Sequence, residues 1–274
     1  MRISLSIIVA AASLAAAQSP SAQFTAQDIL DINSYQVADL TTDGRWLAAT
    51  SSIRRHGYGV DYRRDGDPTY VRPGNVRLWV IDTKTGDRRA IFGEHKKNLR
   101  GARWSPDGSR LAFMQFNGDV WEPVIWDRSS GKLTTLKTPA GKYVAENSDL
   151  RWSTDGARLV YALRTQAWRK AVRDSFANMT GGPIFVQNSK DPFLSWDAIR
   201  RMGSHQSVVA YDTKSAQTTE VLPEGKLSNY DISDDGSVAW FSEDVTKKTD
   251  YDVIFGTDNQ LMSKRLDCGA QAAA

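Results

Sequence analysis

The sequence Trp104-Ser-Pro-Asp-Gly-Ser-Arg-Leu-Ala-Phe113 decides the fold that we predict for this chain. An apolar residue leads into a turn that closes on Asp-Gly, and alternating apolar residues follow. Gly takes the positive φ that such a turn needs and Pro presets φ earlier in the turn, so the stretch predicts a β-hairpin. Related copies stand at 40–49, 152–161 and 232–241.

A second predicted hairpin follows three of the four copies. Each has an apolar strand ending in Asp, a polar turn and a short second strand, and these hairpins cover 78–92, 123–136 and 208–222. The Asp side chain can accept a hydrogen bond from the backbone two residues later, which fixes the turn. Two hairpins give the four antiparallel strands of one propeller blade, and a repeated unit indicates an array of blades.

The repeat therefore predicts that residues 37–274 form an all-β, incomplete β-propeller. Its units are placed at about 37–92, 99–136, 147–222 and an unfinished 228–255. The first and third units contain inserts, at about 53–75 and 164–205, between their second and third strands. In an up-and-down blade this connection lies on the face opposite the first and third connections. We expect both inserts opposite the Asp-Gly turns, and inserts gathered on one face often mark a binding face.

The longer insert begins with helical spacing. Apolar residues from Trp168 to Met179 recur at intervals of three and four, with charged residues between them, and Gly181-Gly182-Pro183 ends the pattern. Such a basic amphipathic helix can be a membrane or partner surface. We favour the other interpretation, a helix that packs against the edge of its own propeller.

The N-terminus has the features of an export signal. Residues 1–17 comprise Arg2, a short apolar run and small residues at Ala15 and Ala17, which describes a secretory signal peptide. The alternative is a buried strand or helix. The run is too short for a comfortable membrane span. We therefore expect a periplasmic or secreted protein with no membrane span.

Residues 18–36 form a predicted N-terminal segment that precedes the first blade. Thr25 and Asp28 have the spacing of a helix-capping box, and Ile29, Leu30 and Ile32 form a short apolar face. This pattern predicts one short helix that leads into the first blade.

Charge and cysteine content narrow the classes of function. The 274 residues carry a formal net charge of +3, which becomes +2 when Arg2 leaves with the signal peptide. A nearly neutral chain is not expected to bind nucleic acid. Arginine pairs such as Arg54-Arg55 and Arg200-Arg201 are interpreted as solvated loop charges. The single cysteine, Cys268, permits no intramolecular disulfide.

The sequence contains no recognisable catalytic constellation. There is no Gly-x-Ser-x-Gly nucleophile motif and no phosphate-binding Gly-x-x-x-x-Gly-Lys motif. The histidines His56, His95 and His205 lie far apart, although His56 and His205 both fall in or at the inserts and could meet in space. A lone loop histidine is usually a surface polar group. We expect no catalytic residue, no cofactor and no metal ligand in this chain.

The chain resembles known propeller families. The Trp-Ser-Pro-Asp-Gly repeat is similar to that of TolB-type propellers, which have six to eight blades. The opening Thr-Ala-Gln-Asp-Ile-Leu at 25–30 and the segment 191–197 resemble the N-terminal half of exported serine peptidases of the prolyl oligopeptidase and dipeptidyl peptidase IV type. The resemblance covers about 25–255. It implies that the propeller caps a catalytic α/β-hydrolase domain, which has no counterpart in this chain.

Three hypotheses about function follow. The first is a non-catalytic, substrate-gating propeller of such a peptidase, which acts on peptides in the full-length protein. The alternative is a stand-alone periplasmic TolB-like propeller that binds a protein or peptide partner. The third, a propeller hydrolase or lactonase with its own metal site, lacks apparent metal ligands. The family's paired glutamates, which hold a substrate amino terminus, are also absent, because the sequence has no Glu-Glu pair.

An unfinished propeller would have bare ends. Nothing after residue 255 follows the blade pattern, and 267–274 looks like a truncated or frameshifted end. We expect an open arc whose end faces are apolar. The alternative is a closed four-bladed ring in which residues 18–36 complete the last blade. The end faces are predicted to present Trp46, Leu47, Trp79, Val238, Trp240 and Phe241.

Overall fold

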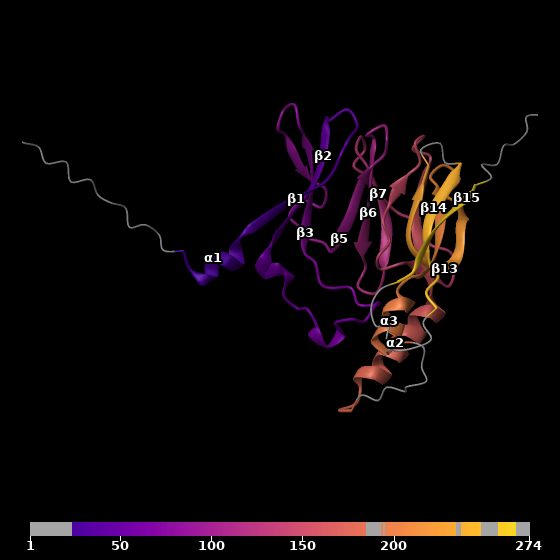
Figure 1. Ribbon diagram of the computed structural model, residues 1–274. Coiled ribbons are helices and arrows are strands. Elements are labelled where there is room, and N and C mark those ends of the chain that lie inside the picture. Colours follow the sequence, from indigo (N-terminus) through magenta and orange to yellow (C-terminus); the bar gives the residue numbers. More distant parts are fainter. Residues whose placement is uncertain (1–23, 185–192, 194, 234–236, 248–256, 267–274) are drawn as a thin grey trace, which may run out of the picture.

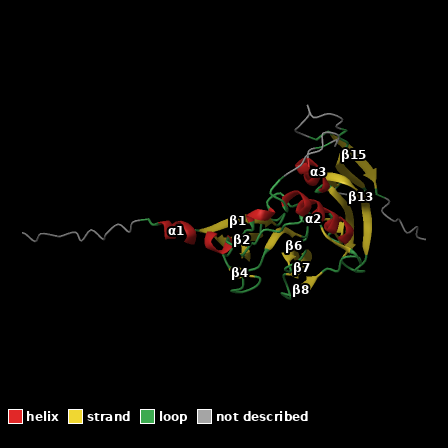
Figure 2. Cartoon of the chain, turned by 90° about the horizontal axis from the view of Figure 1, so that it is seen from below, coloured by secondary structure: helices red, strands yellow, loops and turns green. Residues whose placement is uncertain are grey.

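The computed structural model describes residues 24–184, 193, 195–233, 237–247 and 257–266. Their regular structure consists mostly of antiparallel strands with a few helices, which confirms the predicted all-β class. The strands form four successive blades that are arranged as an arc (Figures 1 and 2). None of the helices in these ranges is long and apolar enough to cross a membrane.

The first two blades have four strands each, in chain order. Blade 1 consists of β1 (Asn33–Leu40), β2 (Trp46–Ile53), β3 (Val76–Asp82) and β4 (Arg88–Ala90). Blade 2 consists of β5 (Leu99–Trp104), β6 (Arg110–Phe116), β7 (Trp121–Asp127) and β8 (Leu133–Thr135).

Blades 3 and 4 share a strand. Blade 3 consists of β10 (Arg151–Trp152), β11 (Arg158–Thr165), β12 (His205–Asp212) and the first part of β13 (Thr218–Ile232). Blade 4 consists of the second part of β13, β14 (Val238–Asp244) and β15 (Asn259–Arg265). The short β9 (Lys142–Val144) joins blades 2 and 3, because Val144 pairs with Leu163 of β11 and with Trp121 of β7.

The Asp-Gly turns are held by one repeated network. The hydroxyl of Ser105 donates to the Asp107 carboxylate at 2.6 Å, and the Ser105 oxygen accepts the amide of Arg110 across the hairpin. The turns at 41–46 and 153–158 repeat this arrangement with Thr41–Asp43 and Ser153–Asp155, both also at 2.6 Å. The hydroxyl therefore ties the turn to the first residue of the next strand in all three hairpins. The turn of the fourth copy includes residues 234–236, which lie outside the described residues.

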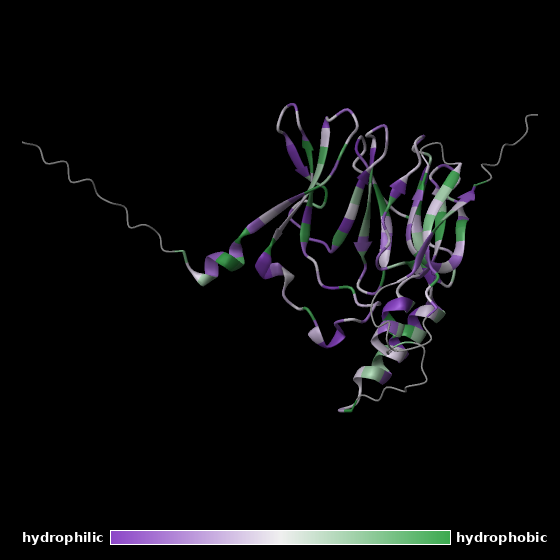
Figure 3. Cartoon of the chain, in the orientation of Figure 1, coloured by the Kyte–Doolittle hydropathy of each residue, from purple (hydrophilic) through white to green (hydrophobic). Residues whose placement is uncertain are grey.

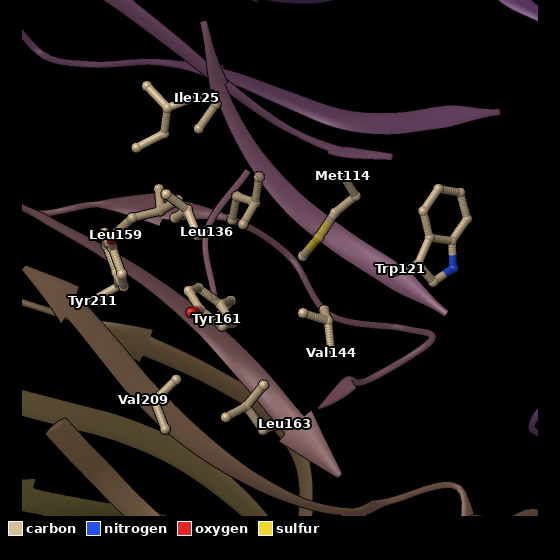
Figure 4. Close-up of a cluster of buried hydrophobic side chains, with 12 residues drawn as sticks. Met114, Trp121, Ile125, Leu136, Val144, Leu159, Tyr161, Leu163, Val209 and Tyr211 are labelled. Atoms are coloured by element: carbon tan, nitrogen blue, oxygen red, sulfur yellow. The ribbon is translucent and has the colours of Figure 1, made fainter. Parts of the chain in front are cut away.

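The core lies between the blades rather than within one of them. Separate clusters of buried side chains fill the three blade interfaces. The cluster between blades 2 and 3 is drawn in Figure 4, where Met114 and Ile125 come from blade 2 and Leu159 and Leu163 from blade 3. Hydrophobic and hydrophilic residues are both present along the strands (Figure 3). Strands β6 and β11 of the two middle blades are buried along most of their length, because these sheets are covered on both faces. Stacking of sheet faces is thus the main source of burial.

The arc is open. Residues 33–36 pair with β2 in blade 1, so they do not complete blade 4, and the predicted alternative of a closed four-bladed ring is wrong. Blade 1 and β15 lie at opposite ends of the array (Figures 1 and 2). Tyr35, Val37 and Trp240 are exposed on the end faces. Trp46 and Phe241, which we had expected there, instead pack into the inner clusters.

Two predicted unit boundaries need correction. Blade 1 begins at Asn33 rather than at 37, and blade 4 reaches Arg265, beyond the predicted end at 255. The first four residues of β1 are exposed, and so are most residues of β15. Such strand residues require no alternation of apolar and polar side chains, so the sequence pattern carried no signal. The strand expected at 251–255 lies outside the described residues.

The short N-terminal helix forms as predicted. Helix α1 (Ala26–Asp31) begins with a capping box, in which the Thr25 amide donates to the Asp28 carboxylate at 2.6 Å and the Thr25 hydroxyl accepts the Asp28 amide. None of its residues is buried, and Leu30 is half-buried. Arg55 pairs with Asp31 and ties the helix to the insert of blade 1.

A pair of glycine substitutions tests the turn geometry. Gly44 and Gly108 both have positive φ, +69° and +65°, but a Cβ on Gly108 would lie 3.0 Å from Thr41, whereas a Cβ on Gly44 would meet nothing within 4 Å. Gly44→Ala should cost about 1 kcal/mol for the left-handed backbone. Gly108→Ala should cost about 1 kcal/mol more, because Thr41 is buried and must move. Urea unfolding measures both, and equal losses would contradict the close approach to Thr41.

The turn carboxylates predict acid sensitivity. Hydrogen bonds from Ser105 and Ser109 lower the pKa of Asp107 to about 2, and the hydroxyls of Thr41 and Ser153 lower those of Asp43 and Asp155. A carboxylate whose pKa is lower in the folded state than in the unfolded state stabilises the fold above about pH 4. This stabilisation is lost as the pH falls toward 2, because the carboxylate becomes protonated. The triple variant D43N/D107N/D155N should therefore lose less stability between pH 4 and pH 2 than the native chain. The denaturant midpoints of both chains at pH 4 and at pH 2 test this. If the variant and the native chain lost the same amount of stability between these pH values, these three carboxylates would not be the source of the acid sensitivity.

Candidate functional site

Both inserts lie on one face of the arc, as predicted. The first connects β2 to β3 and contains the short 3-10 helices η1 (Arg54–Gly57) and η2 (Tyr62–Arg64). The second connects β11 to β12 and contains α2 (Gln166–Thr180) and α3 (Ser195–Met202). Figure 1 shows these helices below the blades and the hairpin turns above them. We call the surface formed by the described residues of 54–75 and 166–204 the insert face.

Helix α2 packs on the propeller through its apolar side. Its N-cap Thr165 accepts the Trp168 amide at 3.1 Å, so the helix starts directly at the end of β11. Trp168 and Val172 are buried against Tyr143, and Val120 and Met202 border this cluster. The arrangement matches the prediction that the helix covers the edge of its own propeller. Its apolar side is consequently occupied.

Arg164 organises the base of the second insert. It is almost fully buried, pairs with Glu146 at 2.5 Å, and lies 4.1 Å from the centre of the Trp168 ring. It also donates to the carbonyl of His205 at 3.1 Å and to the carbonyl of Gly203. One guanidinium thus fixes both ends of the insert, because it lies at the end of β11 and holds the start of β12. A buried arginine with these partners is strongly constrained in position.

A second buried arginine ties α2 to blade 2. Arg169 donates to the Asp119 carboxylate at 2.7 Å and to the Asp119 carbonyl at 2.6 Å. Its guanidinium lies 5.3 Å from the centre of the Tyr143 ring. The hydrogen bond from Arg169 lowers the pKa of Asp119, and burial is the main cause that raises the pKa of Tyr143. At neutral pH the site therefore pairs a carboxylate with a guanidinium above a neutral phenol.

The two inserts touch each other. Arg173 of α2 donates to the Thr69 hydroxyl at 3.2 Å, and the ring of Trp196 lies 3.0 Å from the position of a Cβ on Gly66. Asp67, which is buried, holds this loop by accepting from Arg64 at 2.6 Å and from Thr69 at 2.8 Å. The inserts of blades 1 and 3 therefore meet, and the Arg169–Asp119 pair ties the second of them to blade 2.

The inner strand of blade 2 carries a half-buried arginine beneath the insert face. Arg100 donates to the carbonyls of Ala145 and Ser148 at 3.3 and 3.2 Å and lies 4.7 Å from the centre of the Trp121 ring. Burial lowers its pKa from the usual arginine value, and nearby Asp149 opposes this shift. Arg100 links blades 2 and 3 where their inner strands begin.

Concave surfaces occur at both ends of the inner strands. A pocket of about 330 Å³ opens beside the Asp-Gly turns and is lined by Asp39, Arg103, Arg151 and Trp152 among others. Another, of about 280 Å³, lies between α3 and blade 4, where Arg201 pairs with the buried Asp244. Both linings are rich in charged side chains that already have partners in the protein, including Arg151 with Asp231. They are suited to polar rather than apolar ligands.

The structure places the predicted candidate residues apart. His56 contacts Lys96, whereas His205 begins β12, and burial together with nearby Lys226 lowers its pKa. His95 lies in the turn after β4, and Cys268 lies outside the described residues. Within the described ranges, no three His, Cys, Asp or Glu side chains gather as a possible metal site. The expected absence of catalytic, cofactor and metal residues stays a prediction.

The arginines of this face did not stand out in the sequence. Arg164 and Arg169 looked like the polar positions of an insert, and their partners Glu146 and Asp119 are 18 and 50 residues away. The signal that could have revealed them is local, because Arg164 directly follows the buried run Leu159–Leu163. A charged residue at the end of such a strand requires a partner.

Comparison with known proteins identifies the architecture. No protein-family model and no curated protein matches the chain. Among solved structures, 83% of the chain matches 52% of oligogalacturonate lyase from Vibrio parahaemolyticus, with 14% identity and a TM-score of 0.51. A structure from a study of two prolyl endopeptidases matches 87% of this chain over 29% of its own, with 11% identity and a TM-score of 0.50. The fold is a β-propeller.

The propeller is also similar to TolB from Acinetobacter baumannii, with 13% identity, a TM-score of 0.47, and coverage of 86% of this chain and 42% of that one. The similarity to TolB-like and peptidase propellers is distant, and it concerns the fold alone. This propeller chain spans about half or less of the length of the three structures named. Their activities therefore do not transfer directly to it.

A matched pair of substitutions tests how the second insert is anchored. Arg169→Ala removes a buried guanidinium with two partners, but Asp119 remains solvated at 69% side-chain exposure. The cost should be about 1–3 kcal/mol, below the range for a fully buried pair. The neighbouring Lys170→Ala breaks only an exposed pair with Asp174 and should cost less than about 0.5 kcal/mol. Denaturant unfolding measures the stability of both variants, and hydrogen exchange measures the local opening of α2. Equal effects of the two substitutions would refute the role of Arg169 in holding the helix.

Proposed function

We propose that this chain is the non-catalytic, substrate-gating propeller portion of an exported serine peptidase of the prolyl oligopeptidase type. The Asp-Gly repeats, the opening at 25–30 and the absence of a nucleophile motif support this. The fold similarity to a prolyl endopeptidase structure agrees with it at the level of architecture. In the full-length protein, peptides would be the substrates and the α/β-hydrolase domain would perform the cleavage.

The observation that carries the proposal is the asymmetry of the two faces. Inner strands β1 and β5 begin on the insert face, and α1 lies next to the first insert through Arg55 and Asp31. A chain that enters a four-stranded up-and-down blade on one face also leaves it on that face. A catalytic domain connected to such an array is therefore linked on the insert face, where the two inserts meet and could control the passage of a peptide.

The alternative function is a stand-alone periplasmic propeller that binds a protein or peptide partner. The observation that supports this alternative is the pocket of about 330 Å³ beside the Asp-Gly turns, on the face away from the inserts. A binding propeller would use that pocket without any catalytic domain. For both functions we propose export with removal of residues 1–17, and mass spectrometry of a mature chain that starts at Gln18 would support it.

The test combines sequence and chemistry. The reading frame downstream of codon 274 should continue into a segment with Gly-x-Ser-x-Gly, whereas further blades without that motif would favour the alternative. The purified mature chain should not react with a serine-directed fluorophosphonate probe and should not cleave aminoacyl or Pro-containing chromogenic peptides. Stoichiometric labelling of one serine in this chain would overturn the non-catalytic assignment.

A further inference from the structure

One position of the repeat is charged in all four blades. It lies on the first strand, two residues before the Thr or Ser that begins each turn, and is occupied by Asp39, Arg103, Arg151 and Asp231. The register shows that these positions are equivalent, because each pairs with the third residue of the next strand, namely Ala48, Ala112, Val160 and Trp240. Strand β5 contacts both β1 and β10. Along the arc the order is therefore Asp, Arg, Arg, Asp, with the two arginines on neighbouring blades.

The two aspartates already have partners. The Asp39 carboxylate accepts the backbone amide of Trp104 at 2.7 Å, which joins blade 1 to blade 2. Asp231 pairs with Arg151 at 3.1 Å, and their side chains are 58% and 44% exposed. An ion pair this exposed contributes little to stability, so Arg151 can exchange Asp231 for another anion at a small cost in free energy.

Arg103 has no carboxylate partner within the described ranges. Its Nη1 donates to the carbonyls of Ala38 and Ala102, both at 3.1 Å, so the guanidinium is held between blades 1 and 2. The Nε and Nη2 groups donate to no described residue and stay accessible. Carbonyl oxygens orient the guanidinium but do not neutralise it. Arg103 is consequently a positioned cation with donors to spare.

Both arginines line the pocket of about 330 Å³ beside the Asp-Gly turns. Asp39 is the one carboxylate among the described residues of its lining, so the lining has a net charge of +1. Trp104 also belongs to the lining, and its buried indole N–H has no acceptor in the described part of the chain. Leu40 and Trp152 add apolar surface. The pocket thus combines surplus donors, positive charge and an apolar wall, as small-ligand sites do.

We propose that this pocket binds one carboxylate of a peptide between Arg103 and Arg151, with an apolar group of the peptide against Leu40 and Trp152. The two oxygens of a carboxylate match the fork of a guanidinium. A phosphate dianion fits less well, because the lining has a net charge of only +1 and Asp39 repels the second charge. A carboxyl terminus and an acidic side chain present the same group, and the experiment separates them.

This site goes beyond the proposed function. The pocket lies away from the insert face and is built by blades 1, 2 and 3 alone. It is therefore present with or without a catalytic domain. Binding is measured on this chain itself, so failure of the carboxylate site would leave the peptidase proposal intact, and the reverse also holds.

Calorimetric titration of the mature chain with three short peptides tests the ligand chemistry. The probes are N-acetyl-Ala-Leu with a free carboxyl terminus, its carboxamide, and N-acetyl-Ala-Glu-Ala carboxamide, whose carboxylate is in a side chain. We expect a carboxylate peptide to bind and the Leu carboxamide to bind at least about tenfold more weakly, because the charge-assisted hydrogen bonds are lost. The tighter of the two carboxylate peptides identifies the source. Equal binding of the Leu acid and its carboxamide, no binding of either carboxylate, or equally effective competition by inorganic phosphate would overturn the proposal.

Three substitutions test the residues. Arg103→Gln should weaken binding of the carboxylate peptide about tenfold or more. Asp231→Asn should tighten it about two- to fivefold, because it releases Arg151 from its exposed partner. Arg158→Gln removes an exposed arginine at the start of β11, outside this pocket, and should leave binding unchanged.

The gain in affinity keeps the test independent of folding, since a damaged fold does not bind more tightly. Thermal melts followed by circular dichroism establish that each variant is folded. Unchanged binding by a folded Arg103→Gln chain, absence of tightening in Asp231→Asn, or a loss in Arg158→Gln as large as that in Arg103→Gln would each refute the assignment of this pocket.

Discussion

Each sheet of this protein has two faces that must be covered, and the rest of the structure depends on that constraint. A four-stranded blade buries too little by itself, so its apolar residues are useful only when another blade stacks on them. The three buried clusters lie at the three blade interfaces for this reason. The same constraint explains the exposed apolar residues at the two ends of the arc, such as Val37 and Trp240, where no further blade is present among the described residues.

Arginines make the second layer of connections between blades. Arg128 of blade 2 lies 4.5 Å from the centre of the Trp46 ring of blade 1, and Arg110 lies 4.9 Å from that of Trp152 of blade 3 while it donates to the Gly156 carbonyl. On the opposite face, Arg164 and Arg169 hold the second insert against blades 2 and 3. The planar guanidinium suits this task because it stacks on an aromatic ring and still donates several hydrogen bonds in its plane.

The two faces of the arc consequently differ in what they can do. The turn face is built from a tight, repeated network of hydroxyl and carboxylate groups, and its loops are short. The insert face consists of two long connections that meet through Arg173 and Thr69 and carries exposed aromatic residues such as Tyr62 and Trp196. Function evolves more readily on such connections, since they are positioned by the blades but do not determine how the blades stack.

The sequence alone determined the hairpins, the succession of blades, the capping box of α1 and the face of the inserts, because each depends on residues close together in the chain. The Asp-Gly turn and the alternation after it are local signals. Only the tertiary structure decided that residues 33–36 belong to blade 1, that β15 completes the described part of blade 4, and that Arg164 and Arg169 hold the insert face. Edge strands are exposed and need no alternation, and the partners of buried arginines come from distant segments. Neither property leaves a pattern in a single sequence.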